Sequence, residues 1–260
     1  MTQSTDIPDV EEVLKISDPG EVGRETHGFF DRLMINIGNV TSWLFPILMF
    51  AIVSQVFLRG AGNNQAWLDD FQWWLYGFAM LTAFGYAITT NSHVRVDIFH
   101  QNFSDQKKAK IEVFAIGWLL LPFIAIMTDV LVHYAWQSIV SGEGSSSPNG
   151  LHRVYLLKAT LPVLFLLAGL AAWARFKHNM RQFTDTGLAS QLIWMLPTAI
   201  FVGWRLVHYA AYWVIFFTNS EVKPRRITRE PFFDYALSVA AVSVVALIVL
   251  GLVIRKRKDA

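Results

Sequence analysis

The chain has 260 residues, of which 53% are hydrophobic and only 16% are charged, and its net charge is +2. So small a net charge predicts no nucleic-acid partner, and the lack of cysteine excludes disulfides, thiolate metal ligands and cysteine nucleophiles. The apolar residues stand in blocks of about 20, the length that crosses the hydrocarbon core of a bilayer as a helix. The sequence therefore predicts an all-α, polytopic transmembrane helical bundle.

Residues 1–34 precede the first apolar block as a polar tail rich in Asp and Glu, without the apolar segment of a cleavable signal peptide. The first span contains Pro46, and neighbouring helices tolerate such a kink in lipid. Aromatic residues at helical spacing around Trp67 suit the membrane interface and lead into the second span. The six predicted spans are Ile35–Leu58, Phe71–Thr90, Val113–Val140, Leu156–Ala174, Leu192–Phe217 and Tyr235–Ile254.

Lysine and arginine between the spans predict the orientation. With the N-terminus inside, the inner segments are the tail, 91–110, 175–190 and the C-terminal end, and they hold most of the basic residues. Both termini are therefore predicted to be cytoplasmic. The outer loop 219–234 argues against this orientation, because it contains Lys223, Arg225, Arg226 and Arg229.

The strongest local pattern follows the second span, where His93, Arg95 and Asp97 alternate with other residues. In an extended segment these three side chains share one side, so they could pair with each other or with another chain. A solvated loop beside the membrane is the simpler interpretation of the same residues.

Two further patterns have ordinary explanations when each is taken alone. Asp69 and Asp70 are adjacent carboxylates that could bind a cation, but neighbours on a helix do not face each other. A place at the start of a helix, where acids meet the helix dipole favourably, fits them better. The segment 141–151, SGEGSSSPNGL, is typical of a flexible loop.

In their order and spacing, however, these residues resemble the small membrane subunit of the tripartite ATP-independent periplasmic (TRAP) transporters. The resemblance rests on Arg59, Trp67-x-Asp69-Asp70, Gly85-x-Ala87, His93-x-Arg95-Val96-Asp97, Glu143-x-Ser145, Gly150-Leu151, Lys158 and Pro162. It covers about residues 40–174. Two features depart from the family pattern: Asp-Asp replaces the usual Glu-Glu, and the chain from Gln191 onward adds about two helices to the usual four.

The resemblance implies a four-helix membrane domain at 35–174 and a C-terminal extension at 175–260. It implies a scaffold, not an enzyme, for a large permease subunit in a bacterial inner membrane, without cofactor or metal. The permease would take up an organic acid or similar solute by using an ion gradient, and a periplasmic binding protein would deliver that solute. The interface candidates are Arg59, Trp67, Asp69, Asp70, His93, Arg95, Asp97, Glu143, Ser145 and Lys158. The outer loops 143–149 and 219–234 are candidates for touching the binding protein.

Four ionisable residues fall inside the predicted spans: Asp129 and His133 in the third, and Arg205 and His208 in the fifth. Charges at membrane depth are costly and usually functional, so Asp129 and Arg205 could form a clamp across two helices. Alternatively, Asp129 and His133 are hydrated near the outer headgroups. His133 and His208 could instead ligate haem in an electron-transfer subunit. A membrane anchor or assembly protein without a transport partner is a further alternative.

Overall fold

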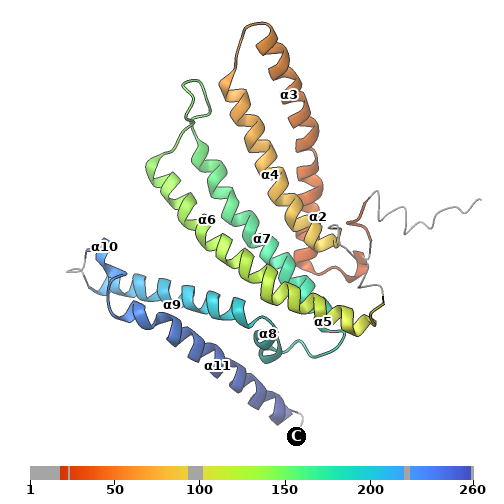
Figure 1. The fold of residues 1–260 in the computed structure, drawn as a ribbon, viewed down its shortest axis with the longest axis vertical. Coiled ribbons are helices and arrows are strands. Elements are labelled where there is room, and N and C mark those ends of the chain that lie inside the picture. The colour runs from red at the N-terminus through yellow and green to blue at the C-terminus, as the bar shows by residue number, and fades with distance from the viewer. Residues whose placement is uncertain (1–17, 23, 93–101, 220–222, 259–260) are drawn as a thin grey trace, which may run out of the picture. The chain divides into compact units, whose positions relative to one another are not determined.

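The computed structural model describes residues 18–22, 24–92, 102–219 and 223–258. In these ranges the regular structure is helical and no strand occurs, which confirms the all-α prediction (Figure 1). The elements are η1 (Arg24–Thr26), α2 (Phe29–Ser42), α3 (Leu44–Gly60), α4 (Ala66–Thr90), α5 (Asp105–Ala115), the π-helical η2 (Ile116–Leu120), α6 (Leu121–Ser141), α7 (Val154–Met180), α8 (Leu188–Trp194), α9 (Leu196–Thr218), α10 (Pro224–Ile227) and α11 (Phe232–Lys258).

The chain divides into two compact units. The first contains residues 1–96 and 127–175, and the second contains residues 97–126 and 176–260. Each unit is described separately below. The domain boundary predicted at 174/175 stays a prediction.

Among the described residues, five helical segments are long and apolar enough to cross a membrane. They are Phe29–Gly60, Asp105–Ser141, Val154–Met180, Leu196–Thr218 and Phe232–Arg257. The second predicted span corresponds to α4, which is not among the five because Trp, Tyr, Thr and acidic residues lower its hydropathy. Its 25 residues extend over about 37 Å, more than the hydrocarbon thickness of about 30 Å. It packs along both α2 and α3 after a loop of five residues.

Prolines account for three interruptions within the predicted spans. Proline has no N–H for the carbonyl four residues earlier, and its ring crowds that carbonyl. Pro46 therefore places the break between α2 and α3 at Trp43, and Pro197 places the break between α8 and α9 at Met195. Pro122 follows the π-helical turn η2 for the same reason.

The core of the first unit forms where α2, α4 and α7 meet at Gly85. A Cβ at Gly85 would lie 2.7 Å from the Met34 sulfur and 3.6 Å from the Ala168 Cα. The rings of Phe84 and Phe165 pack beside this point with their centroids 6.1 Å apart. Helices in lipid gain little from the hydrophobic effect when they associate, so their association depends on close van der Waals packing. The small residues at this point allow that packing.

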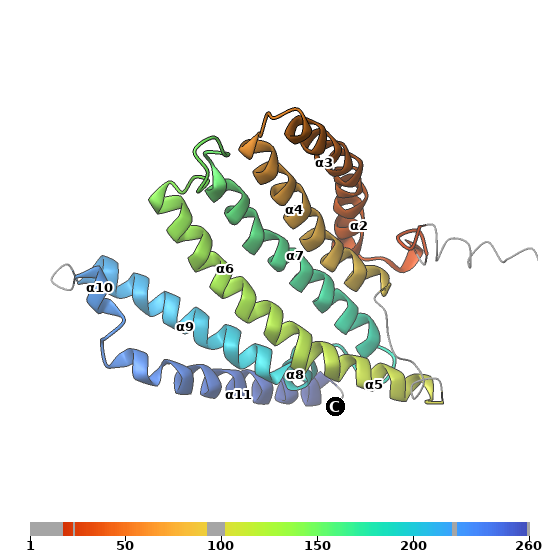
Figure 2. The same ribbon diagram turned by 45° about the horizontal axis from the view of Figure 1, so that its top comes forward.

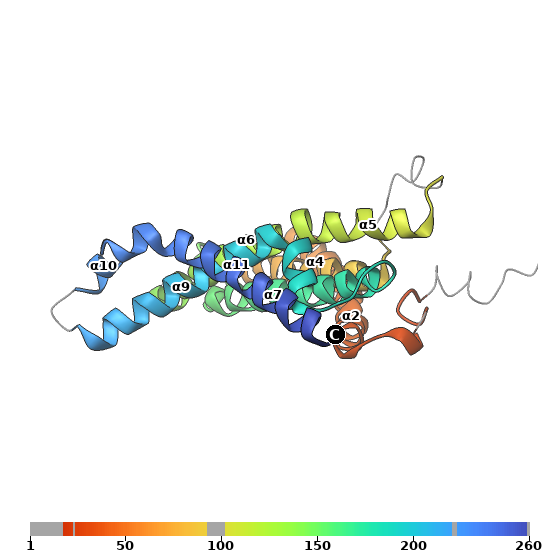
Figure 3. The same cartoon turned by 90° about the horizontal axis from the view of Figure 1, so that it is seen from below.

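The core of the second unit includes an antiparallel pair formed by α9 and α11, which lie side by side with α10 at their turn (Figures 2 and 3). On α11 the buried positions are Ala236, Ala240 and Val244, spaced by four residues. A Cβ at Gly203 of α9 would meet Ala240 and Val244 at 3.7 and 3.5 Å. This spacing of small residues is the usual basis for close helix packing in membranes.

Candidate functional site

Most of the described interface candidates gather in the first unit, where α3 ends, α4 begins and the loop 142–153 joins α6 to α7. We call this group, in which polar side chains contact one another and the backbone of the loop, the polar junction. It comprises Gln55, Arg59, Asn64, Asp69, Asp70, Glu143, Ser145, Gly150, Leu151 and Lys158.

The turn between α3 and α4 brings Arg59 against Asp69. Backbone bonds from Gly62 to the Arg59 carbonyl (3.0 Å) and from Asn63 to the Leu58 carbonyl (2.9 Å) close the end of α3. Gly62 has a φ of 78°, the left-handed conformation that such a Schellman turn requires. The turn therefore positions the last helical side chains of α3 beside the first turn of α4.

Arg59 and Asp69 form an ion pair with 2.7 Å between Nη2 and Oδ2. The Arg59 Nε also donates to the Asn64 side-chain oxygen at 3.1 Å, and the buried Gln55 amide donates to Asp69 Oδ1 at the same distance. Because the Arg59 side chain is 56% exposed, the ion pair adds little stability by itself. Its role in this geometry is to fix the register of α3 against α4.

The neighbouring carboxylate, Asp70, connects α4 to a segment 81 residues away. Its Oδ2 accepts the Leu151 N–H at 2.9 Å, and the Leu151 carbonyl accepts the Ser145 N–H at 3.0 Å. A Cβ at Gly150 would overlap both the Asp70 carboxylate and the Ser145 side chain. Only glycine therefore lets the loop approach this carboxylate so closely.

The loop is also attached to α7 by Glu143 and Lys158. The Lys158 Nζ lies 2.6 Å from both Glu143 carboxylate oxygens and 4.2 Å from the centroid of the Tyr134 ring on α6. The hydrogen bonds from Lys158 are the main reason why the pKa of the Glu143 carboxyl lies below its usual value. The Lys158 side chain is only 14% exposed, so the paired carboxylate compensates for its burial.

The other interface candidates are at or outside the edge of this group. Trp67 lies in the first turn of α4, 44% exposed, and its Nε1 donates to the Gln65 side-chain oxygen at 3.0 Å. His93, Arg95 and Asp97 lie outside the described residues. In the part of the chain that the structure describes, no group of three His, Asp or Glu side chains could hold a metal ion.

One protein family matches this chain. It is described as "Tripartite ATP-independent periplasmic transporters, DctQ component". The match runs over residues 48–182, just over half of the chain. The chain belongs to the DctQ family. Comparisons with curated proteins and with solved structures each gave no significant match.

Membership of the DctQ family confirms the resemblance that the motifs indicated. The family is a component of a transporter, so this chain is a transmembrane transport protein of the TRAP type and a multi-pass protein of a bacterial inner membrane. The whole polar junction, from Gln55 to Lys158, lies within the matched residues. Helices α8 to α11 lie beyond them.

The intramembrane candidates make local contacts within the units to which they belong. The His133 Nδ1 lies 2.8 Å from the Asp129 carbonyl oxygen in the first unit. In the second unit the Arg205 guanidinium donates to the Tyr209 hydroxyl at 3.0 Å, and the His208 ring packs 4.7 Å from that of Phe233. The Asp129–Arg205 clamp and the His133/His208 haem site each involve both units and remain predictions.

Beyond the matched residues, Asp185 joins the C-terminal end of α11 to the start of α8. Its Oδ1 accepts the Ser190 hydroxyl at 2.9 Å and lies 2.6 Å from Arg255 Nη1, while Oδ2 accepts the Gly187 N–H at 3.1 Å. The pKa of Asp185 lies below the ordinary aspartate value of 3.8. The hydrogen bond from Ser190 is the largest cause, and the Gly187 N–H and the charge of Arg255 lower the pKa further. Asp185 was not a candidate in the sequence, where it is one acid in a polar loop.

We expect this carboxylate to make stability depend on pH. Because the pKa of Asp185 is lower in the folded chain than in the unfolded chain, its contribution is complete above the unfolded value and is lost as the pH falls through the folded value. The thermal midpoint of wild type should therefore exceed that of Asp185→Asn at about pH 7, and the difference should shrink towards about pH 3. A difference that is constant or grows on acidification would contradict this assignment.

Proposed function

We propose that this chain is the small membrane subunit that holds a large permease subunit in place. That permease would use an ion gradient to take up an organic acid or similar solute, which a periplasmic binding protein would deliver. The family match carries this proposal, together with the paired charges of the polar junction inside the matched residues. Because these charges pair with one another, they connect α3 to α4 and the loop 142–153 to α7 within the first unit.

The exposed surface of the helices supports a role in binding another membrane chain. In each of the five candidate spans, no more than 22% of the most apolar window is buried within the chain. On α3, for example, Phe50 and Phe57 are 75% and 73% exposed. Such faces can be covered by lipid or by another set of helices, and a static support for a moving permease needs faces of this kind.

The orientation follows if α4 is the sixth crossing. Helix α4 runs back along α2 and α3 after a loop of only five residues. If α2 and α3 together cross the bilayer, α4 therefore crosses it in the opposite direction. Six crossings place both termini on one side, and the basic residues assign that side to the cytoplasm. The polar junction is then at the periplasmic end of the first unit.

The periplasmic loops are where a binding protein would dock in this arrangement. Between α9 and α11, the described side chains of Lys223, Arg226 and Arg229 are all exposed. Basic residues at the rim of an interface mainly accelerate association with an acidic partner and make it sensitive to salt. This accounts for the basic residues in a segment that the orientation places outside.

Purification of the tagged full-length chain from its own membrane in mild detergent tests the proposed function. A large multi-span permease should elute with it in a fixed ratio, and an unrelated tagged membrane protein from the same cells should not retain that permease. Elution of the chain without a permease, or with a haem absorption band, would overturn the proposal.

A further inference from the structure

A row of exposed side chains runs along α5 and η2 in the second unit, and we call it the α5 stripe. It comprises Lys107, Lys110, Phe114 and Trp118. These residues are three or four positions apart, so they lie on one face of the helix. The buried residues Ala109, Val113 and Ile116 form the opposite face, which packs into the unit. The stripe is therefore the outward face of this helical segment.

Aromatic rings hold the two lysines of the stripe in place. The Lys107 Nζ lies 3.7 Å from the centroid of the Phe103 ring, and the Lys110 Nζ lies 5.7 Å from that of Phe183. A ring face attracts a cation without neutralising its charge. Both lysines are exposed, so their positive charges can attract an anion from outside the chain.

The acidic residues near the stripe point away from it or have other contacts. Asp105 and Glu112 are each two residues from a stripe lysine, which places them on the other side of the helix. The Asp105 Oδ1 also lies 3.8 Å from the Nζ of Lys108, outside the stripe. Asp185 of the following loop accepts the Ser190 hydroxyl and pairs with Arg255. The stripe thus presents positive charge.

The lysines and the aromatic residues of the stripe differ in membrane depth. The helical segment Asp105–Ser141 has 37 residues and extends over about 55 Å, longer than a hydrocarbon core of about 30 Å. Its apolar sequence begins at Val113, and Lys110 lies four residues, about 6 Å, before Phe114. The headgroup region is about 5–7 Å deep on each side. The lysines therefore lie among headgroups when Phe114 and Trp118 lie at the edge of the hydrocarbon.

We propose that the α5 stripe binds an anionic phospholipid, with its phosphate beside Lys107 and Lys110 and its acyl chains against Phe114 and Trp118. The rings of Phe114 and Trp118 stack with their centroids 5.5 Å apart and form a continuous apolar surface below the charges. A phospholipid has the same order of charge and hydrocarbon. A soluble acidic protein would use the lysines and leave these rings uncovered. The inference requires only that the segment crosses the bilayer, so it does not depend on the proposed function.

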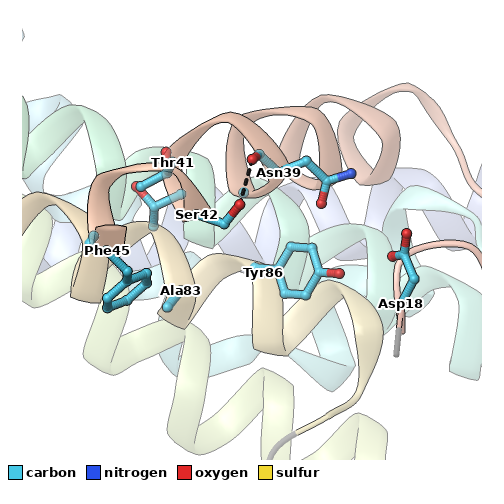
Figure 4. A pocket seen from close by; sticks show the side chains of 10 residues that line it. Asp18, Asn39, Thr41, Ser42, Phe45, Ala83 and Tyr86 are labelled. Carbon is cyan, nitrogen blue, oxygen red and sulfur yellow. Dashed lines mark hydrogen bonds between the residues drawn. The ribbon is translucent and has the colours of Figure 1, made fainter. Parts of the chain in front are cut away.

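The groove beside α4 in the first unit is a contrasting surface (Figure 4). It encloses about 350 Å³, and the described residues that line it include the Asp18 carboxylate and no lysine or arginine. This carboxylate would repel an anionic headgroup. We therefore expect specific binding of anionic lipid at the α5 stripe and not at this groove.

Native mass spectrometry of the full-length chain, titrated with phosphatidylglycerol or phosphatidylcholine, tests this inference. Wild type should bind the anionic lipid more tightly than the zwitterionic one. Lys107→Gln and Lys110→Gln should each weaken binding of phosphatidylglycerol about fivefold. Lys108→Gln is the matched control, because it makes the same change on the same helix outside the stripe, where Asp105 is nearby. It should leave the affinity close to that of wild type.

Three results would overturn the inference. Equal affinity of wild type for the two lipids would show that headgroup charge is not recognised. An equal loss of affinity in all three lysine variants would attribute binding to net charge and not to the stripe. If Lys107→Gln and Lys110→Gln retain the lipid but lose a permease that copurifies with wild type, the stripe is a protein contact. The thermal midpoint of each variant serves as the folding control.

Discussion

Replacing Gly117 by alanine should markedly lower the thermal midpoint of the purified protein. A Cβ at this position would overlap the Trp194 carbonyl oxygen and would lie 3.1 Å from the Phe176 ring. The obstructing atom belongs to the backbone, so it cannot move aside as a flexible side chain could. Overpacking of this kind costs about 1–3 kcal/mol, and leucine at 117 should be more damaging than alanine.

The Gly117 substitution acts at the contact between η2 and the break that separates α8 from α9. The buried Thr198 hydroxyl donates to the Gly117 carbonyl at 3.0 Å, so displacing Trp194 should also break this hydrogen bond. Gly77→Ala is the matched control, because a Cβ at Gly77 in α4 would have no neighbour within 4 Å. Alanine in a helix is favoured over glycine by about 1 kcal/mol, so Gly77→Ala should be neutral or stabilising. Equal midpoints for the two variants would contradict this account of Gly117.

Gly150→Ala should detach the loop 142–153 from α4. Its Cβ would overlap the Asp70 carboxylate and the Ser145 side chain together, and the Leu151 N–H bond to Asp70 requires that close approach. We expect a loss of about 1–3 kcal/mol in stability and faster amide hydrogen exchange in residues 142–153. Hydrogen exchange followed by mass spectrometry measures the second effect directly.

Two further variants separate the steric effect from the hydrogen bond. Gly60→Ala introduces the same group at the end of α3, where a Cβ meets nothing within 4 Å, and exchange in the loop should remain slow. Asp70→Asn keeps an oxygen that can accept the Leu151 N–H, whereas Asp70→Ala removes it, so only the alanine variant should reproduce the fast exchange. Slow exchange in both Gly150→Ala and Asp70→Ala would show that this bond does not hold the loop.

The helices were largely predictable because apolar blocks mark where a chain is buried in lipid. Their ends were less predictable, since a helix need not stop where the lipid stops. The third predicted span began at Val113, but the helical segment begins at Asp105 in polar sequence. The π-helical turn at 116–120 and the break at Met195 depend on Pro122 and Pro197 together with close packing at Gly117.

The candidate site was predictable in part. The motifs identified Arg59, Asp69, Asp70, Glu143 and Lys158, and the structure pairs them as Arg59–Asp69 and Glu143–Lys158. Gln55 was not identified, although a buried polar residue one helical turn before Arg59 is a usable signal. The Asp70–Leu151 contact has no such signal, because it joins a side chain to a backbone N–H 81 residues away.

The most direct test of the central claim is solute uptake by liposomes that contain defined components under an imposed ion gradient. With this chain, the large permease subunit and the periplasmic binding protein all present, we predict uptake that stops when any one of the three is omitted. We also predict that this chain alone carries nothing. Uptake by this chain alone, or full uptake without it, would contradict its assignment as the supporting subunit.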